Sequence, residues 1–428
     1  MNFLELIILE KGCSKVNEKL TSAQLLNQLQ TSHYTEAFKA KMKGQLVGWS
    51  TSIFPQEFCE TMGLTVVYPE NHAAAIAAKK GALPLLEQAE SEGYSVDLCS
   101  YARINLAYMK SQTADIPIPL PDFILCCNNI CNTLIKWYEN IATELNIPMI
   151  LIDVPYNHGY EPTPGAIKYI KAEFVECIRQ LEEITGRKFS EERFLEVMKL
   201  SNEASRAWKH AMDLNQAIPA PLNGFEIFNY MFLMVCARGR KETVEVLNLL
   251  VEELEKKISL GKSCYKDGEK YRVMWDGIAC WPHIGHNFRT FQKNGINIVN
   301  SSYPDAWVLL YEPGNLDELA KVYTMIGNNT CMEYQADKRA QAVNDFKLDG
   351  VLFHVNRSCK VMDFMQYEQQ RQVASRTGVP IMNFDGDQAD PRNFATAQFE
   401  TRLEALMEIM TQSKSSTESM EVKNNDPA

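Results

Sequence analysis

The sequence predicts an α/β protein with two parallel-sheet lobes joined by a helical segment. Short, almost continuously apolar runs alternate with helical patterns in the first and last thirds of the chain. Such runs are typical of parallel strands that are covered on both faces. Between these two regions, residues 162–263 show helical patterns only. A chain of 428 residues is also too long for one small core.

Five segments are expected along the chain. We assign residues 1–33 to a loosely helical N-terminal extension, 34–161 to the first lobe, 162–263 to the helical segment, 264–411 to the second lobe and 412–428 to a disordered tail. The tail is rich in serine, lysine, glutamate and asparagine. Such a composition buries too little apolar surface to offset the entropy of ordering.

The first lobe has four apolar runs that predict its strands, at residues 46–49, 64–68, 123–127 and 148–154. Helical patterns at residues 73–92 and 132–145 lie between these runs. Because strand and helix alternate, the strands are expected to pair in parallel.

The helical segment begins with a clear start signal. Thr163 supplies a capping hydroxyl and Pro164 takes the first helical position, while Gly186 ends the apolar periodicity. A second helix is expected to open at Ser190. A third, at residues 242–257, has an acidic start and lysines at its end, which the helix dipole favours.

The second lobe repeats the alternation after Cys264. Its predicted strands lie at residues 272–275, 296–299, 351–355 and 380–384, and a clear helical pattern covers residues 360–376.

Composition limits the function. Lysine and arginine total 43 against 54 aspartates and glutamates, a formal net charge of -11, which argues against nucleic acid as the main partner. No run reaches the ~18 to 20 apolar residues needed to cross a bilayer. Residues 1–10 lack a basic leader and a cleavage site. We therefore expect a cytoplasmic protein that does not insert into membranes.

The two lobes share a local pattern of strand, Asn-x-x-Cys and helix, ending at Cys131 and Cys359. The loop beyond a strand's carboxyl end is where ligands bind in open α/β sheets. A cysteine at a helix N-terminus is expected to have a lowered pKa. Cys99 also directly precedes a helical pattern.

Twelve cysteines in an acidic chain are expected to stay reduced, and most single cysteines serve only in packing. The chain has no compact ferredoxin-type run and no paired CxxC motif. Three scattered cysteines instead fit a cluster built across the cleft between the lobes, with one metal position open. The neighbouring Cys126 and Cys127 leave the middle ligand undecided.

Polar residues also follow predicted strands. Glu70 lies just beyond a strand and is a candidate for acid–base chemistry. For Asp385 and Asp387 we favour a structural role in turns. His283 and His286 could line a site, although a lone histidine is more often structural.

Five motifs stand out along the chain. They are Tyr-Pro-Glu-Asn at residues 68–71, Asp-Leu-Cys-Ser-Tyr-Ala-Arg at 97–103, Cys-Asn-Asn-Ile-Cys-Asn-Thr-Leu-Ile-Lys-Trp-Tyr-Glu at 127–139, Asn-Arg-Ser-Cys-Lys at 356–360 and Phe-Asp-Gly-Asp-Gln-Ala-Asp-Pro-Arg at 384–392. Together they resemble motifs of the (R)-2-hydroxyacyl-CoA dehydratases. The likeness is to the larger, substrate-binding alpha subunits, as in the 2-hydroxyisocaproyl-, phenyllactyl- and lactyl-CoA enzymes. The likeness runs from about Tyr34 to Met410.

The resemblance implies two flavodoxin-like lobes and a [4Fe–4S] cluster held by Cys99, Cys131 and Cys359. A fourth, non-cysteine ligand is replaced by substrate in the family. Cys131 matches the family position because Cys131-Asn132 precedes the aromatic–Glu pair that ends at residue 139. Family relatives place a serine and a glutamate at the substrate, which correspond to Ser52 and Glu70. No flavin site is supported.

The resemblance also implies a reaction. Water leaves an (R)-2-hydroxyacyl-CoA to give the (E)-2-enoyl-CoA through a ketyl radical, so the enzyme is a hydro-lyase. The implied partners are the acyl-CoA substrate, a smaller beta subunit with its own [4Fe–4S] cluster, and an ATP-dependent iron–sulfur activator that supplies one electron. The alternatives are a benzoyl-CoA-type reductase subunit and a non-catalytic metal-binding scaffold.

Overall fold

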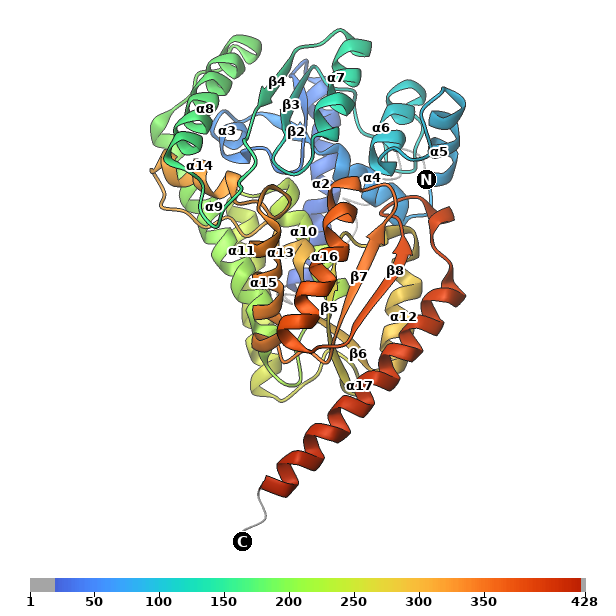
Figure 1. Cartoon of the computed structure of the whole chain (residues 1–428). Coiled ribbons are helices and arrows are strands. Elements are labelled where there is room, and N and C mark those ends of the chain that lie inside the picture. The colour runs from blue at the N-terminus through green and yellow to red at the C-terminus, as the bar shows by residue number, and fades with distance from the viewer. Residues whose placement is uncertain (1–19, 425–428) are drawn as a thin grey trace.

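The computed structural model describes the backbone of residues 20–424 and the side chains of residues 20–415. It contains two separate four-stranded parallel sheets with helices packed around them (Figure 1). The strand orders are β2-β1-β3-β4 and β6-β5-β7-β8, so the second lobe repeats the order of the first. The predicted α/β class with two parallel sheets is therefore confirmed.

The first sheet consists of β1 (Val47–Ser50), β2 (Thr65–Val67), β3 (Phe123–Cys127) and β4 (Met149–Ile152). Each strand coincides with a predicted apolar run to within a few residues. All neighbouring strands pair in parallel, and every residue of β3 is buried. The apolar runs thus mark strands that are covered on both faces.

The helices of the first lobe are α2 (Ser22–Met42), α3 (Gln56–Thr61), α4 (Pro69–Ala78), α5 (Ala82–Ser91), α6 (Ser100–Ser111) and α7 (Thr133–Leu145). The single helix predicted for residues 73–92 is wrong, because α4 and α5 are separate. Lys80 has a positive φ of 64° between them, and this left-handed conformation interrupts a helix.

The helical segment contains α8 (Pro164–Thr185), α9 (Glu191–Asp213), α10 (Gly224–Cys236) and α11 (Lys241–Ser259). Its predicted caps are confirmed. The Thr163 hydroxyl accepts a hydrogen bond from the Ala166 backbone, and Gly186 ends α8 in the left-handed conformation. Helix α10 is buried along nearly its whole length, and the largest apolar core includes residues of this segment and of both lobes.

The second sheet consists of β5 (Tyr271–Asp276), β6 (Ile296–Ser301), β7 (Gly350–Asn356) and β8 (Ile381–Gly386). The surrounding helices are α12 (Ile284–Asn294), α13 (Ser302–Asp305), α14 (Leu316–Thr324), α15 (Met332–Asp345), α16 (Lys360–Thr377) and α17 (Thr396–Asn424). All four strands match predicted runs, and α16 matches the predicted helix.

The two ends of the chain differ from the prediction. Residues 1–19 lie outside the described part, but α2 crosses the predicted boundary at residue 33 and packs against the helical segment. Its Ser22 hydroxyl lies 2.7 Å from the Tyr230 hydroxyl and donates to Glu253 at 2.6 Å. Hydrogen bonds of Ser22, at the start of α2, thus attach this polar helix to the helical segment.

The predicted disordered tail is also corrected, because α17 continues through it to Asn424 and projects from the second lobe (Figure 1). Lysine and glutamate are good helix formers, and a helix satisfies its own backbone. A polar composition therefore does not exclude helix here. Only residues 425–428 of this segment fall outside the described residues.

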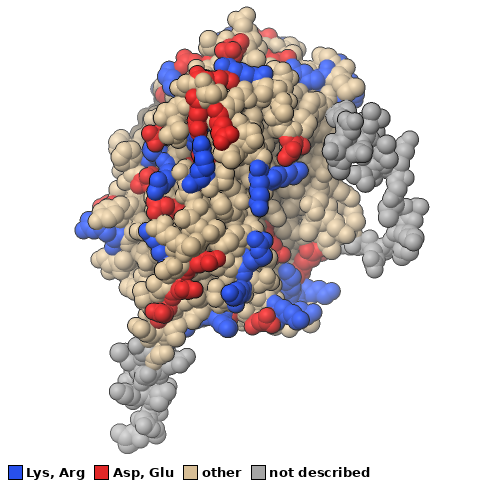
Figure 2. All heavy atoms as spheres, turned by 90° about the vertical axis from the view of Figure 1, so that its right-hand side faces the viewer, with Lys and Arg blue, Asp and Glu red and all other residues tan. Residues whose placement is uncertain are grey.

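The surface is mixed in charge where it can be seen. On the face shown in Figure 2, lysine and arginine side chains are interspersed with aspartate and glutamate. In the part of the chain that the structure describes, no helix combines the length and apolarity that spanning a bilayer requires.

A buried ion pair joins the lobes through the helical segment. Glu57 of α3 and Arg238, just after α10, are both fully buried, with 3.5 Å between Oε1 and Nε. Tyr323 of α14 donates to Glu57 at 2.8 Å. Although burial opposes ionisation, Arg238 and the hydroxyl donors hold the pKa of Glu57 below its usual value. The ion pair therefore stabilises the fold at pH values above the ordinary glutamate pKa. This stabilisation is lost as the pH falls through the lowered pKa of Glu57.

Replacing Glu57 with glutamine is expected to lower the free energy of unfolding by about 3–5 kcal/mol, because it leaves the Arg238 charge buried without a counterion. Denaturant unfolding measures this loss. The matched control is Glu60→Gln, since Glu60 pairs with the partly exposed Arg240 and should cost about 1 kcal/mol or less. Equal losses in the two variants would contradict this account of the interface.

Candidate functional site

A cavity of about 1970 Å³ lies where the first lobe, α10 and the second lobe meet. Its volume exceeds that of typical small-molecule pockets of roughly 300–1,000 Å³. The cavity brings together all five candidate residues from the sequence, which are Ser52, Glu70, Cys99, Cys131 and Cys359. His283 and His286 are not among its lining residues.

Each of the three cysteines lies at the beginning of a helix. Cys99 is the N-cap of α6 and Cys359 is the N-cap of α16, while Cys131 directly precedes Asn132, the N-cap of α7. Cys131 and Cys359 follow β3 and β7, which occupy the same place in the two sheets. All three are half-buried. The repeated strand, Asn-x-x-Cys and helix pattern thus corresponds to equivalent positions in the two lobes.

The sulfur atoms accept hydrogen bonds from neighbouring groups. The backbone N–H of Thr133 donates to Cys131 Sγ at 3.3 Å, and Gln388 Nε2 donates to Cys99 Sγ at the same distance. Donors to sulfur stabilise a thiolate or a sulfur-bound metal centre. Gln388 lies within the motif at residues 384–392, but no local signal in the sequence indicates this contact.

The expectation that the helix N-termini lower the cysteine pKa values is wrong for two of the three. Burial raises the pKa of Cys99 to about 12, with Cys131 acting in the same direction. Burial also raises the pKa of Cys359, as do Cys131 and Cys99. Desolvation of the thiolate outweighs the favourable backbone contacts. Metal binding at these thiols must therefore release protons.

The cavity contains three cysteine thiols from separate parts of the chain. Among the described residues, no three His, Cys, Asp or Glu side chains are grouped closely enough to hold one metal ion. Three thiols around one cavity are the soft donors that iron–sulfur clusters use. Cys126 and Cys127 are fully buried in β3 and do not line the cavity.

Ser52 and Glu70 form a hydrogen-bonded pair at the cavity wall. Ser52 follows β1 and Glu70 lies in the first turn of α4. The backbone N–H and the hydroxyl of Ser52 donate to Glu70 Oε1 at 3.0 and 3.1 Å, and the Tyr138 hydroxyl donates to Oε2 at 2.7 Å. Burial raises the pKa of Glu70, although these donors oppose the shift. The site therefore contains a buried carboxyl group with a raised pKa, a property that proton-transfer groups in active sites often share.

Helix α10 contributes one apolar part of the cavity wall. Phe228, Met231, Phe232 and Val235 of this helix line the cavity, and Trp281 does so from the second lobe. The Trp281 indole N–H donates to the Tyr101 hydroxyl at 2.7 Å. The cavity thus combines apolar side chains and three thiols with the carboxyl groups of Glu70 and Asp115, and Lys39, Lys79 and Arg339 also line it.

Comparison with known proteins now identifies the family. The family described as 2-hydroxyglutaryl-CoA dehydratase, D-component, matches residues 51–410. The chain belongs to this family. It is 51% identical over 401 residues to the (R)-2-hydroxyisocaproyl-CoA dehydratase alpha subunit of Clostridioides difficile, covering 93% of this chain and 98% of the relative. It is 45% identical to the (R)-phenyllactyl-CoA dehydratase alpha subunit of Clostridium sporogenes, covering 94% and 98%.

These matches confirm the resemblance to the 2-hydroxyacyl-CoA dehydratase alpha subunits, which are hydro-lyases. A more distant relative is a benzoyl-CoA reductase subunit of Thauera aromatica, 26% identical over 364 residues, with 81% of this chain and 84% of the relative covered. The chain is also 22% identical over 291 residues to the (R)-phenyllactyl-CoA dehydratase beta subunit of Clostridium sporogenes. The dehydratase alpha subunits are thus nearer to this chain than the reductase or the beta subunit.

Proposed function

We propose that this chain is the substrate-binding alpha subunit that eliminates water from an (R)-2-hydroxyacyl-CoA and gives the (E)-2-enoyl-CoA. The observation that carries this proposal is the convergence of Ser52, Glu70 and three cysteines on one cavity. The likeness to named dehydratase alpha subunits supports the same activity.

Cys99, Cys131 and Cys359 would hold a [4Fe–4S] cluster with three cysteine ligands. When bound, such a cluster supplies an iron with an open position that can act as a Lewis acid toward a substrate oxygen. The protein's part is to supply the three sulfurs, to donate hydrogen bonds to two of them from Thr133 and Gln388, and to restrict water by half-burial.

Ser52 would hydrogen-bond a substrate oxygen, and Glu70 would transfer the proton. The Ser52 hydroxyl turns from Glu70 Oε1 to the thioester oxygen of the substrate, and Oε1 is then free to accept the proton from C3. Glu70 returns that proton to the hydroxide that leaves C2, and water is the product. Because burial raises the pKa of Glu70, its carboxylate is a stronger base than that of an exposed glutamate, and the same group can accept the proton and return it.

A one-electron mechanism accounts for the removal of a C3 proton that is scarcely acidic. We propose that a ketyl radical of the substrate expels the hydroxide and acidifies this proton, and that the electron is returned at the end. The proposed partners are a smaller beta subunit with its own [4Fe–4S] cluster and an ATP-dependent iron–sulfur activator. The names of the relatives as alpha subunits support the first of these.

Anaerobic turnover with the beta subunit and activator tests the proposal. We propose that the acyl chain packs against the apolar residues of α10. We then expect 2-hydroxyisocaproyl-CoA to react faster than 2-hydroxyglutaryl-CoA, because this part of the wall would leave a second carboxylate poorly solvated. A dehydratase forms many enoyl-CoA molecules per electron supplied. One reductant consumed per product would instead favour the benzoyl-CoA-type reductase, and iron-free protein would favour the scaffold.

A further inference from the structure

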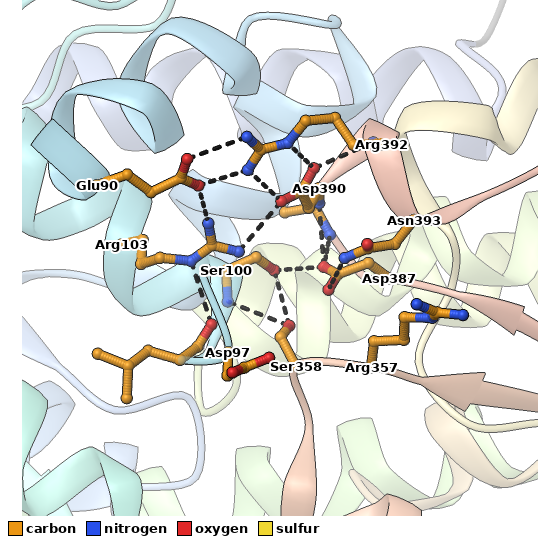
Figure 3. A network of polar contacts seen from close by, with 12 residues as sticks. Glu90, Asp97, Ser100, Arg103, Arg357, Ser358, Asp387, Asp390, Arg392 and Asn393 are labelled. Carbon is orange, nitrogen blue, oxygen red and sulfur yellow. Dashed lines mark hydrogen bonds and ion pairs between the residues drawn. The ribbon is translucent and has the colours of Figure 1, made fainter. Parts of the chain in front are cut away.

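A polar network connects the two lobes through residues that adjoin Cys99 and Cys359 in the sequence (Figure 3). Ser100 follows Cys99 in the sequence, and Ser358 precedes Cys359. The Ser100 backbone N–H donates to Ser358 Oγ at 3.2 Å, and the two hydroxyl oxygens also lie 3.2 Å apart. Both serines are buried. Ser100 and Ser358 are far apart in the sequence, yet they contact each other. Each is the direct neighbour in the chain of a proposed cluster ligand, Cys99 or Cys359.

Asp387, which follows β8, anchors this contact. The Ser100 hydroxyl donates to Asp387 Oδ1 at 2.5 Å. The same oxygen accepts the backbone N–H groups of Ala389 and Asp390 at 2.9 and 3.0 Å, and Oδ2 accepts from Asn393 at 3.3 Å. Asp387 is 0% exposed. A carboxylate fully removed from water is thus satisfied by hydrogen-bond donors from both lobes.

The turn that Asp387 organises also carries Gln388, whose side chain donates to Cys99 Sγ. Around it, Arg103 of α6 pairs with Asp390 at 3.2 Å and with Glu90 of α5. Arg392 pairs with the same two carboxylates. This outer ion network holds the turn against the first lobe, and the inner bridge of Ser100, Ser358 and Asp387 holds the two helix starts against each other.

We propose that Asp387, acting through Ser100 and Ser358, is a positioning residue that sets the separation of Cys99 and Cys359 across the lobe interface. The proposal rests on the proposed cluster function. A three-cysteine site split between two lobes needs a rigid connection, because a small rotation of one lobe would move one sulfur out of bonding distance. The inner bridge supplies that connection within one residue of each sulfur.

The test compares Asp387→Ala with Asp387→Asn and with Glu90→Gln, using full-length chain purified without oxygen. Asparagine retains an acceptor for Ser100 and the two backbone N–H groups, whereas alanine removes all of them. Glu90→Gln alters only the outer ion network. Three quantities are measured for each variant: the rate of iron loss to a chelator, the EPR spectrum of the reduced protein, and amide hydrogen exchange at residues 99–103 and 358–362 in the iron-free protein.

For Asp387→Ala we expect iron loss to be about 10–100-fold faster, a shifted EPR spectrum and faster exchange at both helix starts, because supporting partners of metal ligands typically contribute this much. Asp387→Asn should keep iron retention, the EPR spectrum and hydrogen exchange close to those of wild type. Glu90→Gln should resemble wild type in all three. If Asp387→Ala does not fold, Ser100→Ala removes one bridging hydroxyl and should show the same three changes in smaller measure.

An Asp387→Ala protein with a lower melting temperature but wild-type iron retention, spectrum and exchange would overturn the proposal and leave a purely structural role. Wild-type protein without iron would instead contradict the cluster itself. Even then the hydrogen-exchange comparison would still show whether the bridge holds the two helix starts together. The two failures are therefore distinguishable.

Discussion

Replacing Glu70 with glutamine is expected to lower kcat by about 10²–10⁴-fold, the range that a positioned proton-transfer group contributes. Glutamine has the same shape, and its carbonyl oxygen can still accept both Ser52 donors. The variant should therefore retain the fold, the iron content and a nearly unchanged KM. Steady-state turnover of the complete, activated enzyme measures the effect.

The pH dependence provides a second readout for Glu70. Burial raises the pKa of this carboxyl group, so kcat/KM should rise with pH through an apparent pKa above the ordinary glutamate value if Glu70 accepts the proton. That limb should be missing from the residual activity of Glu70→Gln. Glu60→Gln is the matched control. A Glu70→Gln enzyme within about threefold of wild type, with the acidic limb intact, would exclude this role.

Replacing Cys359 with alanine is expected to remove the iron–sulfur chromophore and all dehydratase activity, because two cysteines cannot hold a cubane that needs three protein sulfurs. Cys99→Ala and Cys131→Ala should give the same result. The matched control is Cys264→Ala, which changes a similarly half-buried thiol outside the cavity. Absorption spectra and iron analysis of anaerobically purified variants measure the loss.

A separate comparison tests whether Cys131, rather than Cys126 or Cys127, is the middle of the three cluster ligands. Cys126→Ala and Cys127→Ala should retain the chromophore, since both side chains are fully buried in β3. Loss of the chromophore in either of these variants, with Cys131→Ala unaffected, would show that the wrong sulfur has been assigned.

Much of the fold could be predicted because its strands are locally encoded. Each of the eight strands is an apolar run, and the caps of α8 are short-range signals from Thr163 and Gly186. The polar tail shows where composition is misleading, because it continues a helix, α17, whose first part packs Phe399, Leu403 and Met410 into the core. The break between α4 and α5 has local signals in Gly81, the N-cap of α5, and Pro84 in its first turn, but the helical periodicity of residues 73–92 hides them.

The sequence indicated residues that line the candidate site, but it did not indicate which side chains contact one another there. The repeated Asn-x-x-Cys pattern indicated Cys131 and Cys359, and the strand end indicated Glu70. Tyr138 as a donor to Glu70 and Asp387 as the partner of Ser100 depend on contacts between distant segments, which no local pattern encodes. The raised cysteine pKa values likewise depend on burial, which only the assembled lobes determine.

Iron and acid-labile sulfide analysis of the wild-type chain, purified without oxygen, tests the central claim most directly. We predict about four iron and four sulfide per chain, as in a [4Fe–4S] cluster, and loss of both in Cys359→Ala. Folded wild-type protein that contains neither iron nor sulfide after reconstitution would contradict the account.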